Sequence, residues 1–197
     1  MIVRILVTAG EPSGDLHGAR VITALRRAWP EAEIEAVGGP RMAAAGAALR
    51  RSIEGLSAIG LFEILSKSPS HLRLERQLIR DFRHGRYDLV IPIDYPGFHG
   101  RVARAAKRAG GPVLWYIAPQ FWAWWPARAR RFAHAVDRLA VILPFEAAFF
   151  RRAGLEATFV GHPLLDSEPP PAREAARTAL GTTPAGRVLA LFPGSRR

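Results

Sequence analysis

The sequence predicts an α/β fold with a parallel sheet flanked by helices, and three observations support this prediction. Short apolar runs of strand length alternate with longer segments in which apolar residues recur at helical spacing. Several of these runs lack polar alternation, as expected for strands buried on both faces. Glycine and proline stand where the runs end. Strand, loop, helix and strand in this order form a βαβ unit, whose strands are parallel and whose crossover is right-handed.

The first βαβ unit begins at the N-terminus. Residues 2–9 are predicted to form a strand, and residues 33–37 the next one. Between them, residues 16–29 carry a helical apolar stripe that Pro30 ends.

The loop GEPSGD, residues 10–15, separates the first strand from this helix. It matches neither the dinucleotide-binding fingerprint nor the P-loop. Its glycines let a ligand approach a helix N-terminus, which favours anions, whereas Glu11 and Asp15 favour contacts with hydroxyl groups or sugars. The residues alone support a ligand-binding loop and a tight turn equally, and Ser13 or Asp15 can also cap the helix.

Residues 52–82 combine apolar side chains with cations. The apolar residues are concentrated first, and a helix is predicted to begin at Ser68-Pro69. Such a segment can lie at a membrane surface, although a helix packed on the sheet is the simpler interpretation. The residues that would face a membrane are Ile59, Leu61, Phe62, Arg73 and Arg76.

Asp94 follows the apolar strand at residues 89–93 and precedes a helix predicted over residues 98–109. Ligands of open α/β sheets bind outside the carboxyl ends of the strands, so Asp94 is a candidate site residue. The alternative is that Asp94 only caps the following helix, and this stretch alone favours the cap.

The C-terminal half continues the alternation. Strands are predicted at residues 112–117, 138–143 and 157–160, with a helix at residues 145–153. Tryptophans at positions 122, 124 and 125 precede several arginines, which suggests a stacking platform or an amphipathic anchor, with a core cluster as the alternative.

Composition changes after residue 165. Residues 166–172 form a stiff, proline-rich linker, followed by a short helix at residues 173–180 and a strand at Val188–Phe192. This order resembles the opening of a second α/β domain. The apolar strand would have no partner in the chain, so we expect a mobile tail or one shared between two chains in a homodimer.

The net charge of +11, carried almost entirely by arginine, favours polyanionic partners such as nucleic acid, anionic lipid or phosphorylated substrates. A nucleic-acid-binding module is one alternative, but the cations are scattered and no known nucleic-acid motif appears, which argues against it. The absence of cysteine excludes disulfides and thiolate metal sites and favours the cytoplasm. No Asp-x-Asp occurs, so a metal clamp on a diphosphate is not indicated.

Eight motifs, in order along nearly the whole chain, resemble the lipid-A-disaccharide synthase family of inverting GT-B glycosyltransferases. The motifs are GEPSGD (10–15), VGGPRM (37–42), IGLFEIL (59–65), IDYPGF (93–98), APQFWAW (118–124), LPFE (143–146), VGHPL (160–164) and LFPGSR (191–196). The family is longer than this sequence. The resemblance therefore implies a Rossmann-like N-terminal domain over residues 1–165 and the start of a truncated UDP-binding domain at residues 173–197.

The resemblance also implies a reaction. The family transfers 2,3-diacylglucosamine from UDP to 2,3-diacylglucosamine 1-phosphate without a cofactor, in the cytoplasm, as a peripheral protein of the inner membrane. By motif, Asp94 matches the proposed general base and Arg196 a residue near the UDP diphosphate. Glu11, Ser13 and Asp15 match the substrate-facing loop. One departure is His99, which stands where the family usually has asparagine. A GT-B relative acting on another UDP-sugar is the main alternative.

Overall fold

The computed structural model describes residues 2–52, 69–166, 169–183 and 186–192. Its strands form two parallel groups, in the order β3-β2-β1-β4 and β5-β6-β7. Parallel bridges from Val90 to Val113 and from Ile93 to Tyr116 connect β4 to β5. The strands are β1 (Arg4–Thr8), β2 (Glu33–Gly38), β3 (Ala48–Ser52), β4 (Leu89–Pro92), β5 (Leu114–Tyr116), β6 (Arg138–Val141) and β7 (Ala157–Phe159).

Helices connect most successive strands, which makes the parallel arrangement possible. Five of the described α-helices begin with a proline, whose fixed φ suits the first helical turn and whose missing N–H costs nothing there. The helices are α1 (Pro12–Ala28), α2 (Pro40–Ala44), α4 (Pro69–Arg83), α5 (Pro96–Arg108), α6 (Phe121–Trp124), α7 (Arg128–Ala133), α8 (Pro144–Arg152) and α9 (Arg173–Ala179), with a 3-10 turn η1 at Pro163–Asp166.

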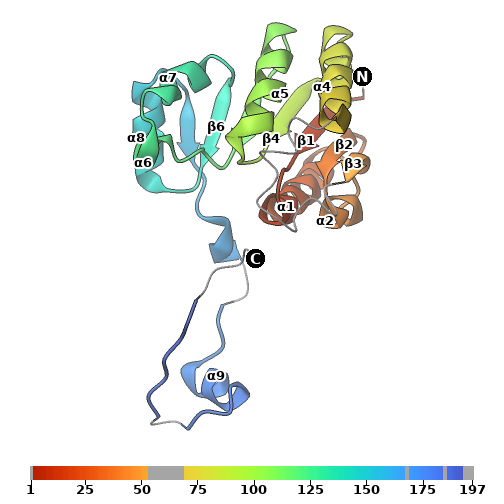
Figure 1. The fold of residues 1–197 in the computed structure, drawn as a ribbon. Helices are drawn as coiled ribbons and strands as arrows, with labels where there is room; N and C mark the ends of the chain where they lie inside the picture. The colour runs from red at the N-terminus through yellow and green to blue at the C-terminus, as the bar shows by residue number, and fades with distance from the viewer. Residues whose placement is uncertain (1, 53–68, 167–168, 184–185, 193–197) are drawn as a thin grey trace.

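The sheet is buried on both faces. Figure 1 shows α4 and α5 on one side of β1, β2 and β4, with α1 and α2 on the other. Successive residues of a strand point to opposite faces, so Leu6 packs in the core that includes helix α4 while Ile5 and Val7 pack in the core that includes α1. This explains why β1 and β4 carry continuous apolar runs rather than alternating polar and apolar residues.

The strand order reverses beside β1. From β1 the chain proceeds outward to β2 and β3, then returns to place β4 on the other side of β1. The loops that follow β1 and β4 therefore leave the sheet in opposite directions, and the crevice between such loops is where open α/β sheets bind their ligands.

The parallel α/β fold and the predicted strands of residues 2–160 are confirmed, with boundaries shifted by a few residues. The sequence interpretation missed α2, β3, α6 and α7, which are short. The strand predicted at Val188–Phe192 was wrong: residues 186–192 form no strand, and the side chains of Leu189 and Phe192 are 87% and 92% exposed. No strand in the described part of the chain pairs with this segment, and an isolated strand has no ladder to stabilise it.

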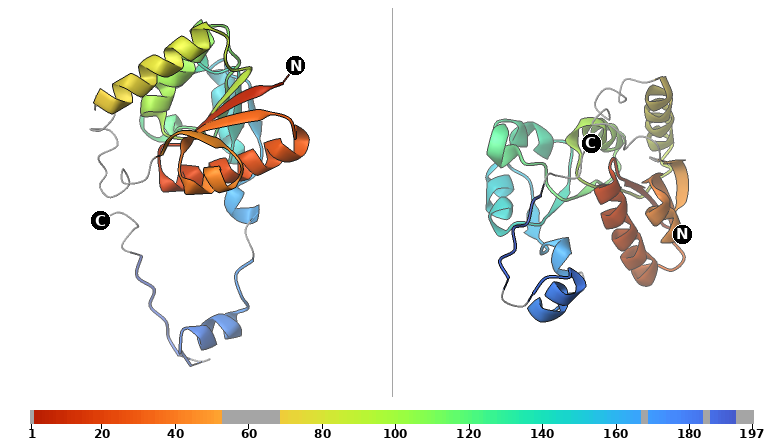
Figure 2. Two further views of the ribbon diagram at one scale, coloured as in Figure 1. Left: turned by 90° about the vertical axis from the view of Figure 1, so that its right-hand side faces the viewer. Right: turned by 60° about the horizontal axis from the view of Figure 1, so that its bottom comes forward.

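Helix α9 buries none of its residues. Figures 1 and 2 show it on an arm that extends away from the sheet. The division of the chain at residues 165 and 173 stays a prediction.

Candidate active site at the carboxyl ends of the strands

The loops after β1 and β4 touch each other at the point where the strand order reverses. A Cβ added to Gly10 would lie 3.1 Å from two ring atoms of Tyr95, which is closer than a side chain normally approaches. Glycine at position 10 therefore lets the two loops meet. The GEPSGD loop and the segment around Asp94 form one continuous site.

The backbone at this site is strained. Asp94 and Tyr95 both have φ of 48°, and Ile117, which follows the neighbouring strand β5, has φ of 67°. No other non-glycine residue in the described ranges has a positive φ. Asp94 is held to β5 by a hydrogen bond of 2.9 Å from its N–H to the carbonyl of Tyr116. Such strain is concentrated at functional sites, because only a specific requirement for geometry maintains it.

The structure excludes the alternative that Asp94 caps the next helix. The N-cap of α5 is Tyr95, and no side chain caps that helix. The side chain of Asp94 instead lies exposed at the end of β4.

Although the residue keeps solvent access, the surrounding protein partly desolvates its carboxyl group, and this raises the pKa of Asp94. The backbone N–H of Tyr95 acts in the opposite direction, while the carboxylates of Glu11 and Glu146 raise the pKa further. A carboxyl group with a raised pKa is a stronger base once ionised, as general-base catalysis requires.

Glu146, on α8, is a buried member of this group that the sequence interpretation did not single out. Its side chain is 2% exposed and accepts hydrogen bonds of 3.0 Å from the Trp122 indole N–H and the Leu143 backbone N–H. The signal available was its place in the LPFE motif, at the third position of a helix, where Glu reaches back to the N-cap.

The structure corrects the prediction for GEPSGD, because residues 12–15 form the first turn of α1 rather than a loop. The N-cap is Glu11 and no side chain caps the helix, so neither Ser13 nor Asp15 has the predicted capping role. Ser13 is exposed and Glu11 is partly buried. Asp15 is 4% exposed, and its carboxylate accepts hydrogen bonds from three backbone N–H groups. They belong to Gly39 at 2.8 Å, Met42 at 3.1 Å and Arg41 at 3.1 Å. Asp15 therefore fixes the β2–α2 loop, whereas Glu11 and Ser13 keep exposed surface at the start of α1.

Several predicted residues lie outside the described part of the chain: Arg196, Ile59, Leu61 and Phe62. The two described residues of the predicted membrane-facing set, Arg73 and Arg76, are exposed on α4. With Arg80 and Arg83 they form a stripe of cations at helical spacing, opposite the buried Leu74 and Leu78. We call Arg73, Arg76, Arg80 and Arg83 the α4 arginine stripe.

Of the three tryptophans at positions 122, 124 and 125, the first packs against the protein and the other two are exposed. Trp122 makes an edge-to-face contact with Phe145 at 4.9 Å and bonds to Glu146. Trp124 and Trp125 are 72% and 55% exposed, and the Arg128 guanidinium stacks 4.4 Å from the centre of the Trp125 ring. Only the latter two tryptophans fit the predicted surface platform.

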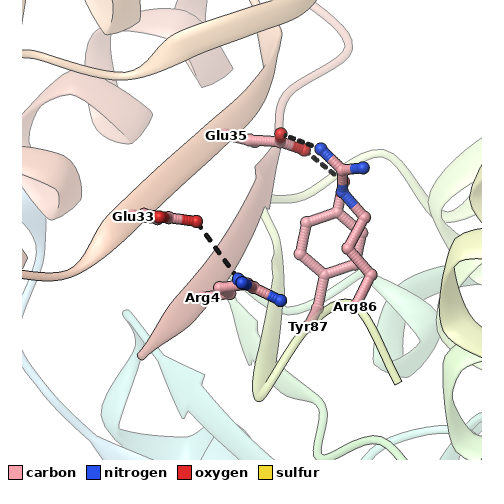
Figure 3. Close-up of a pocket in the computed structure, with 5 residues that line it drawn as sticks. All are labelled: Arg4, Glu33, Glu35, Arg86 and Tyr87. Atoms are coloured by element: carbon pink, nitrogen blue, oxygen red, sulfur yellow. Dashed lines mark hydrogen bonds and ion pairs between the residues drawn. The ribbon is translucent and has the colours of Figure 1, made fainter. Parts of the chain in front are cut away.

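A hollow of about 210 Å³ lies at the opposite, amino ends of the strands. Figure 3 shows its lining, in which the charges are already paired. Arg4 lies 3.1 Å from Glu33, and Glu35 accepts hydrogen bonds from Arg86, at 2.5 Å, and from Tyr87. Burial opposes ionisation of Glu35, but these hydrogen bonds outweigh it and lower the pKa. The position and the pairing both argue for a structural role.

Arg50 extends this network to the overlying helix. It lies 3.2 Å from Glu35 and 2.8 Å from Asp81 of α4. The network therefore ties α4, with its arginine stripe, to β2 and β3.

No group of three or more His, Asp and Glu side chains in the described ranges is placed to hold a metal ion. Among the helices that the structure describes, none has the length and apolar character needed to cross a membrane.

The doubly wound parallel sheet defines a Rossmann-like α/β domain, and Asp94, on a strained backbone at its switch point, marks a candidate ligand site at the strand ends. Sequence comparison identifies the family. The family profile described as "Lipid-A-disaccharide synthetase" matches residues 5–197, so the chain belongs to the lipid-A-disaccharide synthase family.

Individual relatives agree with this assignment. The lipid-A-disaccharide synthases of Geobacter metallireducens and Alkalilimnicola ehrlichii are each 43% identical to the chain, and that of Trichlorobacter lovleyi is 41% identical. Each comparison covers 98% of this chain. The chain spans about half the length of these curated relatives, 51–52% of each.

Proposed function

We propose that the protein carrying this chain is an inverting glycosyltransferase that joins UDP-2,3-diacylglucosamine to 2,3-diacylglucosamine 1-phosphate in lipid A synthesis and releases UDP. The observation that supports this most directly is the carboxylate of Asp94, exposed on a strained backbone at the switch point of the sheet. Membership of the family supports the substrate class.

In the proposed reaction Asp94 acts as the general base. The acceptor hydroxyl attacks the anomeric carbon from the face opposite UDP, and Asp94 takes the hydroxyl proton as the new bond forms. Glu11 and Ser13 stand beside the same site and are proposed to hold sugar hydroxyl groups. Arg196 is proposed to contact the diphosphate, whose negative charge grows as UDP leaves.

The α4 arginine stripe is proposed to face the anionic surface of the inner membrane from the cytoplasm, since both substrates carry acyl chains. The four cations lie on one side of the helix, whereas the acidic side chains of α4, Glu75 and Asp81, are paired with Arg101 and Arg50. Each arginine near an anionic surface contributes about 1 kcal/mol of binding.

The test is UDP release by the full-length protein, supplied with both diacylated substrates. Transfer to the diacylated acceptor, with little release from UDP-N-acetylglucosamine, is the expected result. Efficient use of the non-acylated donor would instead show a GT-B enzyme acting on another UDP-sugar. No UDP release with either donor would contradict the proposed function.

A further inference from the structure

His99 is a fully buried polar side chain next to the strained site. It lies in the second turn of α5 with no exposed surface, and its Nδ1 is 3.0 Å from the carbonyl oxygen of Asp94. A carbonyl oxygen can only accept, so Nδ1 carries the hydrogen. The other ring nitrogen, Nε2, has no hydrogen-bond partner among the described residues.

Trp115 makes the equivalent contact at the neighbouring strand. Its indole N–H donates to the carbonyl of Ile117 over 3.1 Å, and the side chain is completely buried. Thus Asp94 and Ile117, the two left-handed residues at strand ends, each have their backbone carbonyl bonded to the N–H of a buried ring, His99 and Trp115 respectively. The two rings pack edge to face, 6.2 Å between centres.

The aromatic surroundings fix where the imidazole lies. Besides Trp115, the rings of Tyr95 and Phe98 contact it, each 5.9 Å away between centres. Burial among these rings lowers the pKa of His99 to about 4, so the imidazole is neutral at physiological pH. It can therefore hold the Asp94 carbonyl without placing a positive charge beside the carboxylate.

We infer that His99 is a positioning residue, which holds the Asp94 backbone in its left-handed conformation through the Nδ1–H bond and so places the carboxylate for its reaction. The inference rests on the proposed role of Asp94. A left-handed aspartate relaxes to an ordinary conformation unless its surroundings oppose this, and the relaxation would move the carboxylate. Catalytic groups need to be held to within about 0.5 Å by such supporting contacts.

Two substitutions separate the hydrogen bond from the packing. His99→Leu keeps an apolar side chain of similar size but removes the donor, whereas His99→Asn keeps a short N–H donor. Phe98→Leu is the control, because it disturbs the same buried ring cluster without removing a bond to Asp94.

Kinetics of the full-length protein give the first readout. His99→Leu is expected to lower kcat by about tenfold or more with KM within about twofold, since a misplaced base affects the chemical step. His99→Asn should retain kcat within about threefold. Phe98→Leu should lower the melting temperature without a comparable loss of kcat. Equal kcat for His99→Leu and the parent would overturn the inference.

Nuclear magnetic resonance gives a second readout that does not depend on turnover. The parent should show a protonated Nδ1 and an unprotonated Nε2 on His99, and an Asp94 carboxyl that titrates above its ordinary pKa. The pKa of Asp94 should differ from the parent value in His99→Leu but not in His99→Asn. An Nε2–H tautomer in the parent would overturn the inference even if His99→Leu fails to fold. If His99→Leu changes the pKa of Asp94 but the parent protein has no transferase activity, the positioning role of His99 stands and only the proposed function is refuted.

Discussion

The carboxylate of Asp15, on α1, accepts a hydrogen bond of 2.8 Å from the backbone N–H of Gly39, at the start of the next helix. The contact leaves no room for a side chain at position 39, where a Cβ would lie 2.5 Å from the Asp15 carboxylate. Two successive loops at the carboxyl edge of the sheet are therefore joined through one buried side chain.

Asp15→Ala should destabilise the fold rather than weaken substrate binding. Removing the carboxylate leaves the buried N–H groups of Gly39 and Met42 without an acceptor, at a cost of about 1–3 kcal/mol. Urea unfolding would measure this loss, and KM of the folded fraction should stay within about twofold. An increase in KM without loss of stability would show that Asp15 contacts substrate directly.

Glu35 should contribute more to stability than Glu33, although the two lie on the same face of β2. Glu35→Ala leaves Arg50, which is only 20% exposed, without one partner, and should cost about 1–3 kcal/mol. Glu33→Ala is the matched control, because its pair with Arg4 is more than half exposed and should contribute about 0–1 kcal/mol. Equal losses in thermal unfolding would contradict the structural role of the Glu35 network.

Much of the fold follows from local sequence pattern. The continuous apolar runs in β1 and β4 identify buried parallel strands, and Pro69 marks the start of α4 as predicted. The helices predicted from residues 16, 98 and 145 begin earlier, at Pro12, Pro96 and Pro144, because proline suits the first helical turn. The short elements α2 and β3 were missed because five residues carry too little periodicity. The failed strand at Val188–Phe192 shows the opposite error, since an apolar run predicts a strand only where a partner strand exists.

The site was predicted only in part, because burial and partners are not visible in sequence. Asp94 could be found by its place after a strand. The role of Asp15 depends on Gly39, which is 24 residues away, and Glu146 acts on Asp94 from the first turn of α8, 52 residues further along the chain. The left-handed conformation of Asp94 could not be predicted from Asp-Tyr-Pro, because aspartate tolerates a positive φ better than most residues but adopts it in only a minority of cases.

Burial of His99 should make the fold sensitive to acid. Its pKa is lowered from 6.5 to about 4, so between these pH values the unfolded chain is protonated at His99 and the folded chain is not. The folded state has its full stability above pH 6.5 and loses roughly 3 kcal/mol as the pH falls through 6.5 toward 4. Urea unfolding at pH 7.5 and pH 4.5 should show a smaller acid loss in His99→Asn than in the parent. An equal loss would show that His99 is not buried as a neutral side chain.

Membrane binding should depend on the α4 arginine stripe. Arg73→Glu with Arg76→Glu removes two exposed cations from one side of the helix and should weaken co-sedimentation with anionic vesicles by about tenfold or more. Arg27→Glu with Arg152→Glu, at exposed positions on α1 and α8, is the control, because it changes the net charge by the same amount away from the stripe. Equal binding by the double variant and the parent would refute the membrane-facing role of Arg73 and Arg76.

Asp94→Asn should also separate stability from activity. Because the folded protein raises the pKa of Asp94, its ionisation costs stability at neutral pH, and this cost is absent below the ordinary pKa of 3.8. The variant should therefore melt at a higher temperature than the parent at pH 7.5, with the gain disappearing near pH 3.5. A lower melting temperature at pH 7.5 would contradict the raised pKa.

The most direct test of the proposed mechanism is the turnover of Asp94→Asn in the full-length protein. The amide keeps the size of the carboxyl group but cannot take the acceptor proton, so kcat should fall by about 10²–10⁴. Asp88→Asn, at the other end of β4, should keep turnover within about threefold, because its carboxylate accepts the backbone N–H of Arg4, at the edge of the sheet opposite Asp94. Turnover of Asp94→Asn close to that of the parent would contradict the assignment of Asp94 as the general base.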